Sequence, residues 1–183
     1  MELEIKFRKE RITFGIIFFL IMFTFSNFFI IKPEIFIRNI FMKEFHIQIL
    51  GIMGIVYFSA LFISFLKLYS TKYAISITEE FIIDNSRYES LGKIEWQNIS
   101  KIERIKKKGI EIFVNDTVFQ NRKLNLIQKF LMFMGNWNYK KSIIISSALL
   151  DCSIEELYEN ITKTYQSYKK TTHNRRLARL RIL

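Results

Sequence analysis

The chain offers few residues that could act as a nucleophile, and Cys152 is its single cysteine. A thiol needs a base within hydrogen-bond reach before it can attack a substrate. No histidine is near Cys152 in the sequence, whereas Asp151, Glu155 and Glu156 surround it. Neighbouring negative charge raises the pKa of a thiol and lowers its reactivity. We therefore expect Cys152 to be inert rather than catalytic.

The remaining polar residues do not form a catalytic or metal-binding pattern. The two histidines, His46 and His173, are far apart, and His173 lies in a basic tail. The acidic pairs at 79–80 and 155–156 stand beside turns or at a helix start, where solubility and the helix dipole explain them. The six glycines form no phosphate-binding loop. The sequence thus predicts a protein that is not an enzyme and that has no cofactor or metal ion.

Two long stretches without charged side chains, residues 12–31 and 46–66, stand in the first part of the chain. At about 1.5 Å per helical residue, each would cover roughly 30 Å, the thickness of the hydrocarbon core of a bilayer. Two buried helices of a soluble protein are the alternative, but the rest of the chain is too small to surround them. We therefore expect a hairpin of two transmembrane helices over residues 12–66.

A cleaved signal peptide is a second alternative for residues 12–31, because a basic segment precedes them. The apolar run is longer than an ordinary signal core, however, and no small-residue cleavage site follows it. An uncleaved membrane anchor therefore explains the segment better.

The basic residues around the two stretches indicate an orientation. Six of them flank the outer ends of the hairpin, against three in the connector at 32–45. This contrast favours both termini in the cytoplasm and a connector that lies along the outer interface. The sequence thus predicts a multi-pass protein of a bacterial inner membrane, with a basic cytoplasmic N-terminus at residues 1–11.

Residues 67–169 have the composition of one small soluble domain. Short stretches rich in β-branched residues predict strands at 73–78, 81–84, 93–96, 110–114 and 142–146, with further strand character around Ile102 and Ile105. The pattern changes to helical spacing over 121–134, with an apolar stripe of Leu124, Ile127, Leu131 and Met134. A capping box, in which Ser153 and Glu156 bond reciprocally, predicts a last helix that runs to about Lys169. Strands followed by a capped helix indicate an α+β domain with an antiparallel sheet.

The order of these elements resembles a family of uncharacterised bacterial membrane proteins, in which a two-helix transmembrane hairpin precedes a pleckstrin-homology-like (PH-like) domain. The segment IEWQNISKI at 94–102 is similar to the strand-to-strand segment of that domain, and LLDCSIEEL at 149–157 is similar to its closing helix. One departure is YKKS at 139–142, where family members often have a Gly-x-Pro type turn. The resemblance implies a small bent antiparallel sheet or barrel capped by a C-terminal helix, and no enzymatic activity.

The formal net charge is +11, and basic residues are concentrated in two places. One is an expected loop near 104–109, and the other is the tail at 170–183, whose leucine spacing suggests an amphipathic helix. A disordered tail that only satisfies the topology rules is the alternative. The candidate contacts with anionic lipid headgroups are Lys106, Lys107, Lys108, Arg175, Arg176, Arg179 and Arg181.

These observations favour a binding or scaffolding domain that is held against the bilayer, with the lipid surface as its partner. The same charge would attract nucleic acid, but no groove-reading or aromatic–basic strand motif supports that partner. Two functions with an unidentified protein partner remain open: an immunity protein that neutralises a toxin, and a regulatory subunit of a membrane complex.

Overall fold

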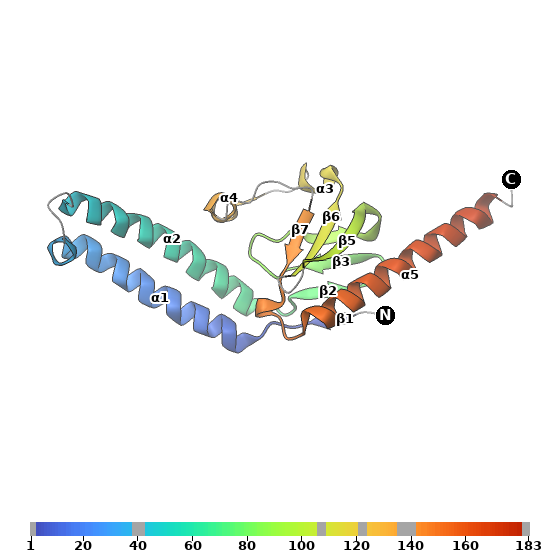
Figure 1. The fold of residues 1–183 in the computed structure, drawn as a ribbon, viewed down its shortest axis with the longest axis horizontal. Coiled ribbons are helices and arrows are strands. Elements are labelled where there is room, and N and C mark those ends of the chain that lie inside the picture. Colours follow the sequence, from blue (N-terminus) through green and yellow to red (C-terminus); the bar gives the residue numbers. More distant parts are fainter. Residues whose placement is uncertain (1–2, 38–42, 106–108, 121–123, 135–141, 181–183) are drawn as a thin grey trace. The chain divides into compact units, whose positions relative to one another are not determined.

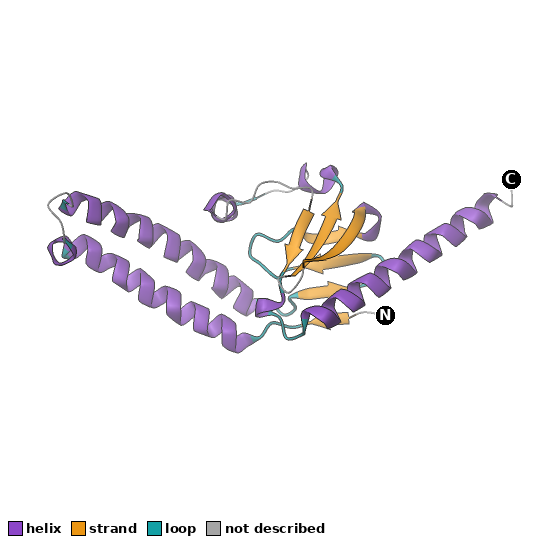
Figure 2. Ribbon diagram, in the orientation of Figure 1, coloured by secondary structure: helices purple, strands orange, loops and turns teal. Residues whose placement is uncertain are grey.

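The computed structural model describes residues 3–37, 43–105, 109–120, 124–134 and 142–180. The chain forms two compact units, one from Lys9–Ser70 and the other from Met1–Arg8 together with Thr71–Leu183. The first unit is a pair of long helices, and the second combines antiparallel strands with helices (Figures 1 and 2). The predicted hairpin followed by an α+β domain is therefore confirmed at this level.

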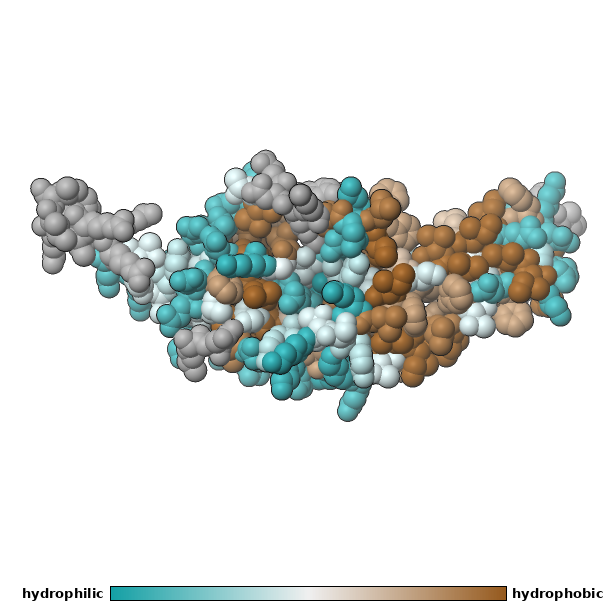
Figure 3. Space-filling model, turned by 180° about the vertical axis from the view of Figure 1, so that it is seen from behind, coloured by the Kyte–Doolittle hydropathy of each residue, from teal (hydrophilic) through white to brown (hydrophobic). Residues whose placement is uncertain are grey.

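The helical unit consists of α1 (Lys9–Ile31), the 3-10 turn η1 (Pro33–Phe36) and α2 (Glu44–Ser70). Both long helices extend beyond the uncharged stretches, and both are long and apolar enough to span a membrane. Few of their residues are buried; Phe14 and Met53, for example, are 73% and 59% exposed. Figure 3 shows apolar side chains gathered over this part of the chain. Water is a poor solvent for such a surface.

Small residues allow α1 and α2 to pack closely against each other. A Cβ atom on Gly51 would lie 2.9 Å from the Ser26 carbonyl oxygen and 2.7 Å from Ile30 Cγ1. One turn further along α2, Gly54 leaves room for the buried Ser26 side chain, whose hydroxyl donates to the Met22 carbonyl at 2.8 Å. Close approach through small residues is a common way for helices to associate in lipid.

Both ends of the helix pair carry further contacts. At the connector end, the Phe29 and Phe36 rings meet edge to face, with centroids 4.5 Å apart. At the open end, the Lys9 ammonium donates to the Tyr69 carbonyl oxygen and lies 4.8 Å from the centre of the Tyr69 ring. The pair is thus held together along its whole length.

The second unit contains two antiparallel sheets, ordered β1-β2-β3-β4 and β5-β6-β7. Their elements are β1 (Leu3–Ile5), β2 (Ile75–Ile77), β3 (Phe81–Asp84), β4 (Gly92–Glu95), η2 (Trp96–Asn98), β5 (Ile99–Ile105), β6 (Gly109–Val114), α3 (Asp116–Gln120), α4 (Leu126–Met134), β7 (Ser142–Ile145), η3 (Ser147–Leu149) and α5 (Ile154–Leu180). Gly92 opens β4 with φ +74°, a conformation that favours glycine. The strands agree with the expected positions, apart from β1.

The strand that sequence patterns missed, β1, lies in the segment that we expected to be a separate basic N-terminus. Its residues pair with β2 in the register Leu3 to Ile77 and Ile5 to Ile75. Immediately afterwards, Phe7 bridges to Leu150, and the Arg8 amide donates to the Leu149 carbonyl at 2.8 Å. The N-terminal segment therefore belongs to the domain that otherwise begins some 70 residues later, and it joins the four-stranded sheet to the chain beyond β7.

The core of this unit lies between the sheets and α5. Ile154, Leu157, Ile161 and Tyr165, spaced by three or four residues, form the buried face of α5. The Tyr165 hydroxyl donates to the Ile99 carbonyl oxygen at 2.7 Å. Beyond Tyr165, a helix continues to Leu180 and does not end near Lys169 as predicted. No glycine or proline follows Ser153, so nothing in the sequence breaks the helix.

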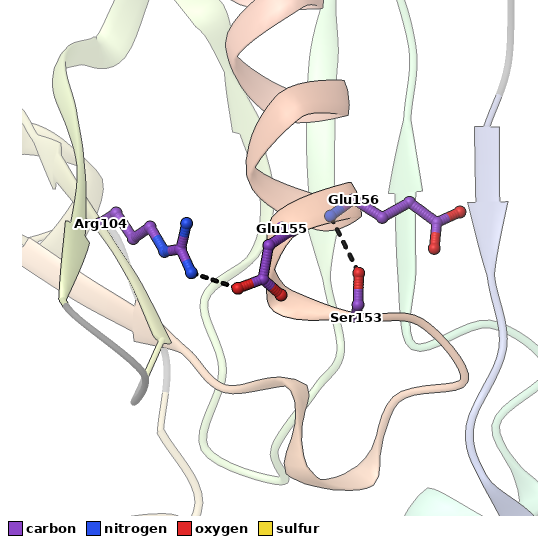
Figure 4. A network of polar contacts seen from close by, with 4 residues as sticks. All are labelled: Arg104, Ser153, Glu155 and Glu156. Atoms are coloured by element: carbon purple, nitrogen blue, oxygen red, sulfur yellow. Dashed lines mark hydrogen bonds and ion pairs between the residues drawn. The ribbon is translucent and has the colours of Figure 1, made fainter.

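Of the two hydrogen bonds in the capping box predicted at the start of α5, one is confirmed and the other is wrong. The Glu156 amide donates to the Ser153 hydroxyl at 3.1 Å, as a capping box requires. The Glu156 side chain, however, points away from Ser153 (Figure 4). Glu155 instead forms an ion pair with Arg104 of β5, which links the helix start to the second sheet.

Candidate functional site

The basic residues predicted to contact lipid headgroups remain untested by the structure. Lys106, Lys107, Lys108 and Arg181 lie outside the described residues. Arg175, Arg176 and Arg179 belong to α5, but only their helical backbone is described. Arg104, at the start of the first basic cluster, lies in β5 and pairs with Glu155. This arginine therefore serves packing between strand and helix.

The helix α4, between β6 and β7, has an unusual composition for a solvent-exposed element. Seven of its nine residues are apolar, and only Gln128 and Lys129 interrupt them. No residue of α4 is buried; Leu126 and Phe133 are 83% and 81% exposed, and Met134 is 47% exposed. The predicted stripe of Leu124, Ile127, Leu131 and Met134 is only half-buried or exposed. The helix therefore contributes little to the core.

Polar contacts fix the start of α4 to the loop between β3 and β4. The Gln128 amide donates to Asn125 Oδ1 at 2.8 Å, and the Asn125 amide donates to Gln128 Oε1 at 3.1 Å. This pair is a reciprocal capping box. The same two side chains reach Tyr88: Gln128 Nε2 donates to its carbonyl oxygen at 2.8 Å, and Asn125 Nδ2 to its hydroxyl at 3.0 Å. The position of α4 is thus set by polar groups on one side of the helix.

The loop that carries Tyr88 is itself organised around a buried carboxylate, Asp84. This side chain is 3% exposed, and its Oδ1 accepts a hydrogen bond from the Ser86 amide at 2.9 Å. Burial raises the pKa of Asp84, whereas the hydrogen bonding from Ser86 and the charge of Arg87 oppose the rise. The Asn85 amide donates to the Ala74 carbonyl at 2.8 Å, which ties the loop to the start of β2. Asp84 therefore has a structural explanation as the organiser of the loop that holds α4.

Cys152 lies in the short segment before α5 and is half-buried. Burial raises the pKa of its thiol to about 11, and the charges of Glu156 and Asp151 add to the rise while Arg8 opposes it. The expected rise of the pKa is confirmed, with burial as its largest cause. A thiol of this kind is almost wholly protonated at neutral pH.

Two features of α4 were not predicted from the sequence: where the helix begins, and its contact with Tyr88. The Asn125-x-x-Gln128 spacing directly before an apolar run is a helix-start signal that would have placed the beginning of α4. No sequence pattern indicated the role of Tyr88, because its contact with α4 depends on the tertiary fold. Within the described ranges, no three His, Cys, Asp or Glu residues gather as a metal site would require.

Comparison of the chain with protein-family models, with curated proteins and with solved structures finds no match.

Proposed function

We propose that this chain is an integral membrane protein whose α+β domain is a non-catalytic binding or scaffolding module held at the cytoplasmic face of a bacterial inner membrane. In this proposal α1 and α2 cross the bilayer, and the domain is PH-like. Two small antiparallel sheets and a capping C-terminal helix support the PH-like assignment. The mostly exposed apolar surface of α1 and α2 supports the crossing.

One observation carries the proposal: the strands on either side of the helix pair are hydrogen-bonded neighbours. Three residues lie between β1 and α1, and four lie between α2 and β2. Because β1 and β2 pair with each other, both ends of the intervening segment must be on the same side of the membrane. An even number of crossings satisfies that condition and a single crossing does not, and the exposed apolar surface of α1 and α2 supports two crossings rather than none. The excess of basic residues at these ends favours the cytoplasmic side.

Cysteine accessibility tests this topology. Single cysteines would replace three exposed acids, Glu4 before α1, Glu34 in η1 and Glu159 in α5, in a Cys152→Ser background. We expect a membrane-impermeant maleimide to label position 34 in intact spheroplasts, and positions 4 and 159 only in inverted vesicles. Labelling of positions 4 and 159 from opposite sides, or of all three from one side, would contradict the proposal.

Recovery of partners from native membranes tests the binding role. The full chain would be purified in mild detergent beside a variant with Arg175, Arg176, Arg179 and Arg181 changed to Gln. We expect the bilayer to be the partner, so neither form should retain a stoichiometric protein. One protein retained equally by both forms would replace the lipid-surface proposal with immunity or complex regulation.

A further inference from the structure

We infer that α4 is an interfacial anchor, which inserts the apolar face marked by Leu126, Phe133 and Met134 into the headgroup region of the bilayer that holds the protein. This inference rests on the proposed membrane location and names the element that touches lipid. It differs from the basic residues considered above, because the contact is apolar and lies on a different part of the chain.

The polar contacts of α4 and its most exposed apolar side chains lie on different sides of the helix. Leu126 and Phe133 are seven residues apart, about two helical turns, so they point in nearly the same direction. Gln128, at roughly 200° from Leu126 around the helix, is the residue that bonds Tyr88. Gln128 therefore bonds the helix to the domain on one side, whereas Leu126 and Phe133 face away from that contact and most of the other apolar residues of α4 are half-buried. A helix that served the core would have the reverse arrangement.

The exposed apolar surface of the domain is concentrated on this helix. Among the described residues of the α+β unit, the large apolar side chains that are more than a third exposed are Leu126, Phe133 and Met134 of α4 and Ile144 of β7. With nine residues, α4 is about 14 Å long, which is too short to cross a bilayer. A helix of this size and composition suits a position in the interface plane.

Charge and aromatic composition favour lipid as the occupant over a protein. Between Asp116 and Asp151 the sequence has no acidic residue and five basic ones, of which Lys129 is an exposed residue of α4. Trp and Tyr also follow α4 in the sequence, and these residue types are enriched at membrane interfaces together with Lys and Arg. Anionic headgroups complement such a segment.

The connections to the helices favour lipid for a second reason. Three residues separate β1 from α1, and four separate α2 from β2. Even fully extended, four residues cover no more than about 14 Å. If α1 and α2 span the bilayer, the domain cannot leave its surface, and an apolar face on the domain meets lipid at a high effective concentration.

Site-directed fluorescence quenching tests the inference on the full chain. The protein, with Cys152→Ser, would be placed in vesicles of phosphatidylethanolamine and phosphatidylglycerol, with an environment-sensitive label on one cysteine at a time. The test positions are Leu126→Cys and Phe133→Cys. Glu159→Cys, exposed on α5, is the matched control for insertion driven by the label itself, and Phe18→Cys in α1 reports on the helix pair.

We expect a spin-labelled lipid to remove most of the emission at positions 126 and 133, and iodide in the water to have little effect there. Position 159 should behave in the opposite way. Quenching of positions 126 and 133 by iodide would overturn the inference, because the face would then lie in water. Protection from both quenchers would overturn it as well, since a protein or a second copy would then cover the face.

Position 18 separates failure of the inference from failure of the proposed function. Quenching by the lipid at 18 but not at 126 and 133 leaves the membrane location intact and refutes the anchor alone. An unquenched label at 18 would instead remove the membrane location on which the anchor depends. In a Trp137→Phe background, emission of the buried Trp96 in unlabelled samples checks that each variant retains the native fold.

Discussion

The membership of the N-terminal segment in the α+β domain can be tested by a single truncation, Phe7→Ala. Phe7 is 4% exposed and stands where the chain bridges from β1 to Leu150. Removing a buried phenyl ring costs about 3–5 kcal/mol, through lost transfer free energy and the cavity that remains. Small domains are stable by only about 5–15 kcal/mol, so the loss is a large share of the total. We therefore expect Phe7→Ala to lower the free energy of unfolding of a domain whose other residues begin at Thr71.

Urea unfolding of the full chain in detergent micelles, followed by the emission of Trp96, measures this change. Trp96 is 1% exposed, and its indole N–H donates to the Thr78 carbonyl at 2.9 Å, so its emission should shift to the red on unfolding. A Trp137→Phe background leaves Trp96 as the single reporter. The smaller change Ile5→Val, with an expected loss of about 0.5–1.5 kcal/mol, guards against a variant that does not fold.

The matched control is Glu4→Ala, an exposed position on the same strand, which should change stability by no more than about 0.5 kcal/mol. The refuting result is equal stability of the Phe7→Ala and Glu4→Ala proteins. In that case residues 3–7 would not pack in the domain, and the argument from strand pairing to a two-crossing topology would fail with them.

Three further outcomes follow from the geometry. Gly51→Ala should destabilise the helix pair by about 1–3 kcal/mol in a denaturing-detergent titration, because the new Cβ would meet the Ser26 carbonyl. Ile52→Ala, on the exposed side of α2, should have little effect, and equal losses from the two variants would contradict close packing. Burial raises the pKa of Asp84 above its unfolded value, so the folded state binds the extra proton and this group costs stability as pH rises through the folded pKa. The stability of Asp84→Asn relative to wild type should therefore increase from acid to neutral pH in urea unfolding, and a flat difference would show that Asp84 is not desolvated. With its pKa raised to about 11, Cys152 should react with iodoacetamide at pH 7 on the order of tenfold more slowly than an unstructured cysteine peptide, because the smaller thiolate fraction is partly offset by a more nucleophilic thiolate. Comparable rates would mean that the thiol is not shielded.

The parts of the fold that sequence patterns predicted are those in which the pattern is local. Freedom from charge over 12–31 and 46–66 identified the two long helices, and runs of β-branched residues located β2 to β7. The helical spacing in the sequence predicted one face of α5, made of Ile154, Leu157, Tyr158, Ile161, Tyr165 and Tyr168. Four of these residues are buried, and Tyr158 and Tyr168 are half-buried. In each case a few consecutive turns or one strand contain the whole signal.

The features that were missed depend on contacts between distant parts of the chain. Three residues, Leu3 to Ile5, carry too little pattern to be distinguished from a basic flank, and only their pairing with β2 defines them as a strand. The helical period of 124–134 was recognised, but the period does not state which face is covered, and the polar contacts to Tyr88 decide it. The candidate basic contacts were chosen by charge and, in the tail, by leucine spacing, and neither specifies where the side chains lie.

β1 and β2 pair with each other although the whole helix pair lies between them in the sequence. Neighbouring strands lie about 4.8 Å apart, whereas the axes of packed helices lie about 8–10 Å apart. Three residues lead from β1 to α1 and four lead from α2 to β2, and these short connections cover the difference in spacing. β1 has three ladder positions and belongs to the edge of its sheet, so it is the part of the sheet with the fewest bonds to lose. β1 is therefore the strand whose loss costs this sheet the fewest hydrogen bonds, and local opening of the sheet should begin there.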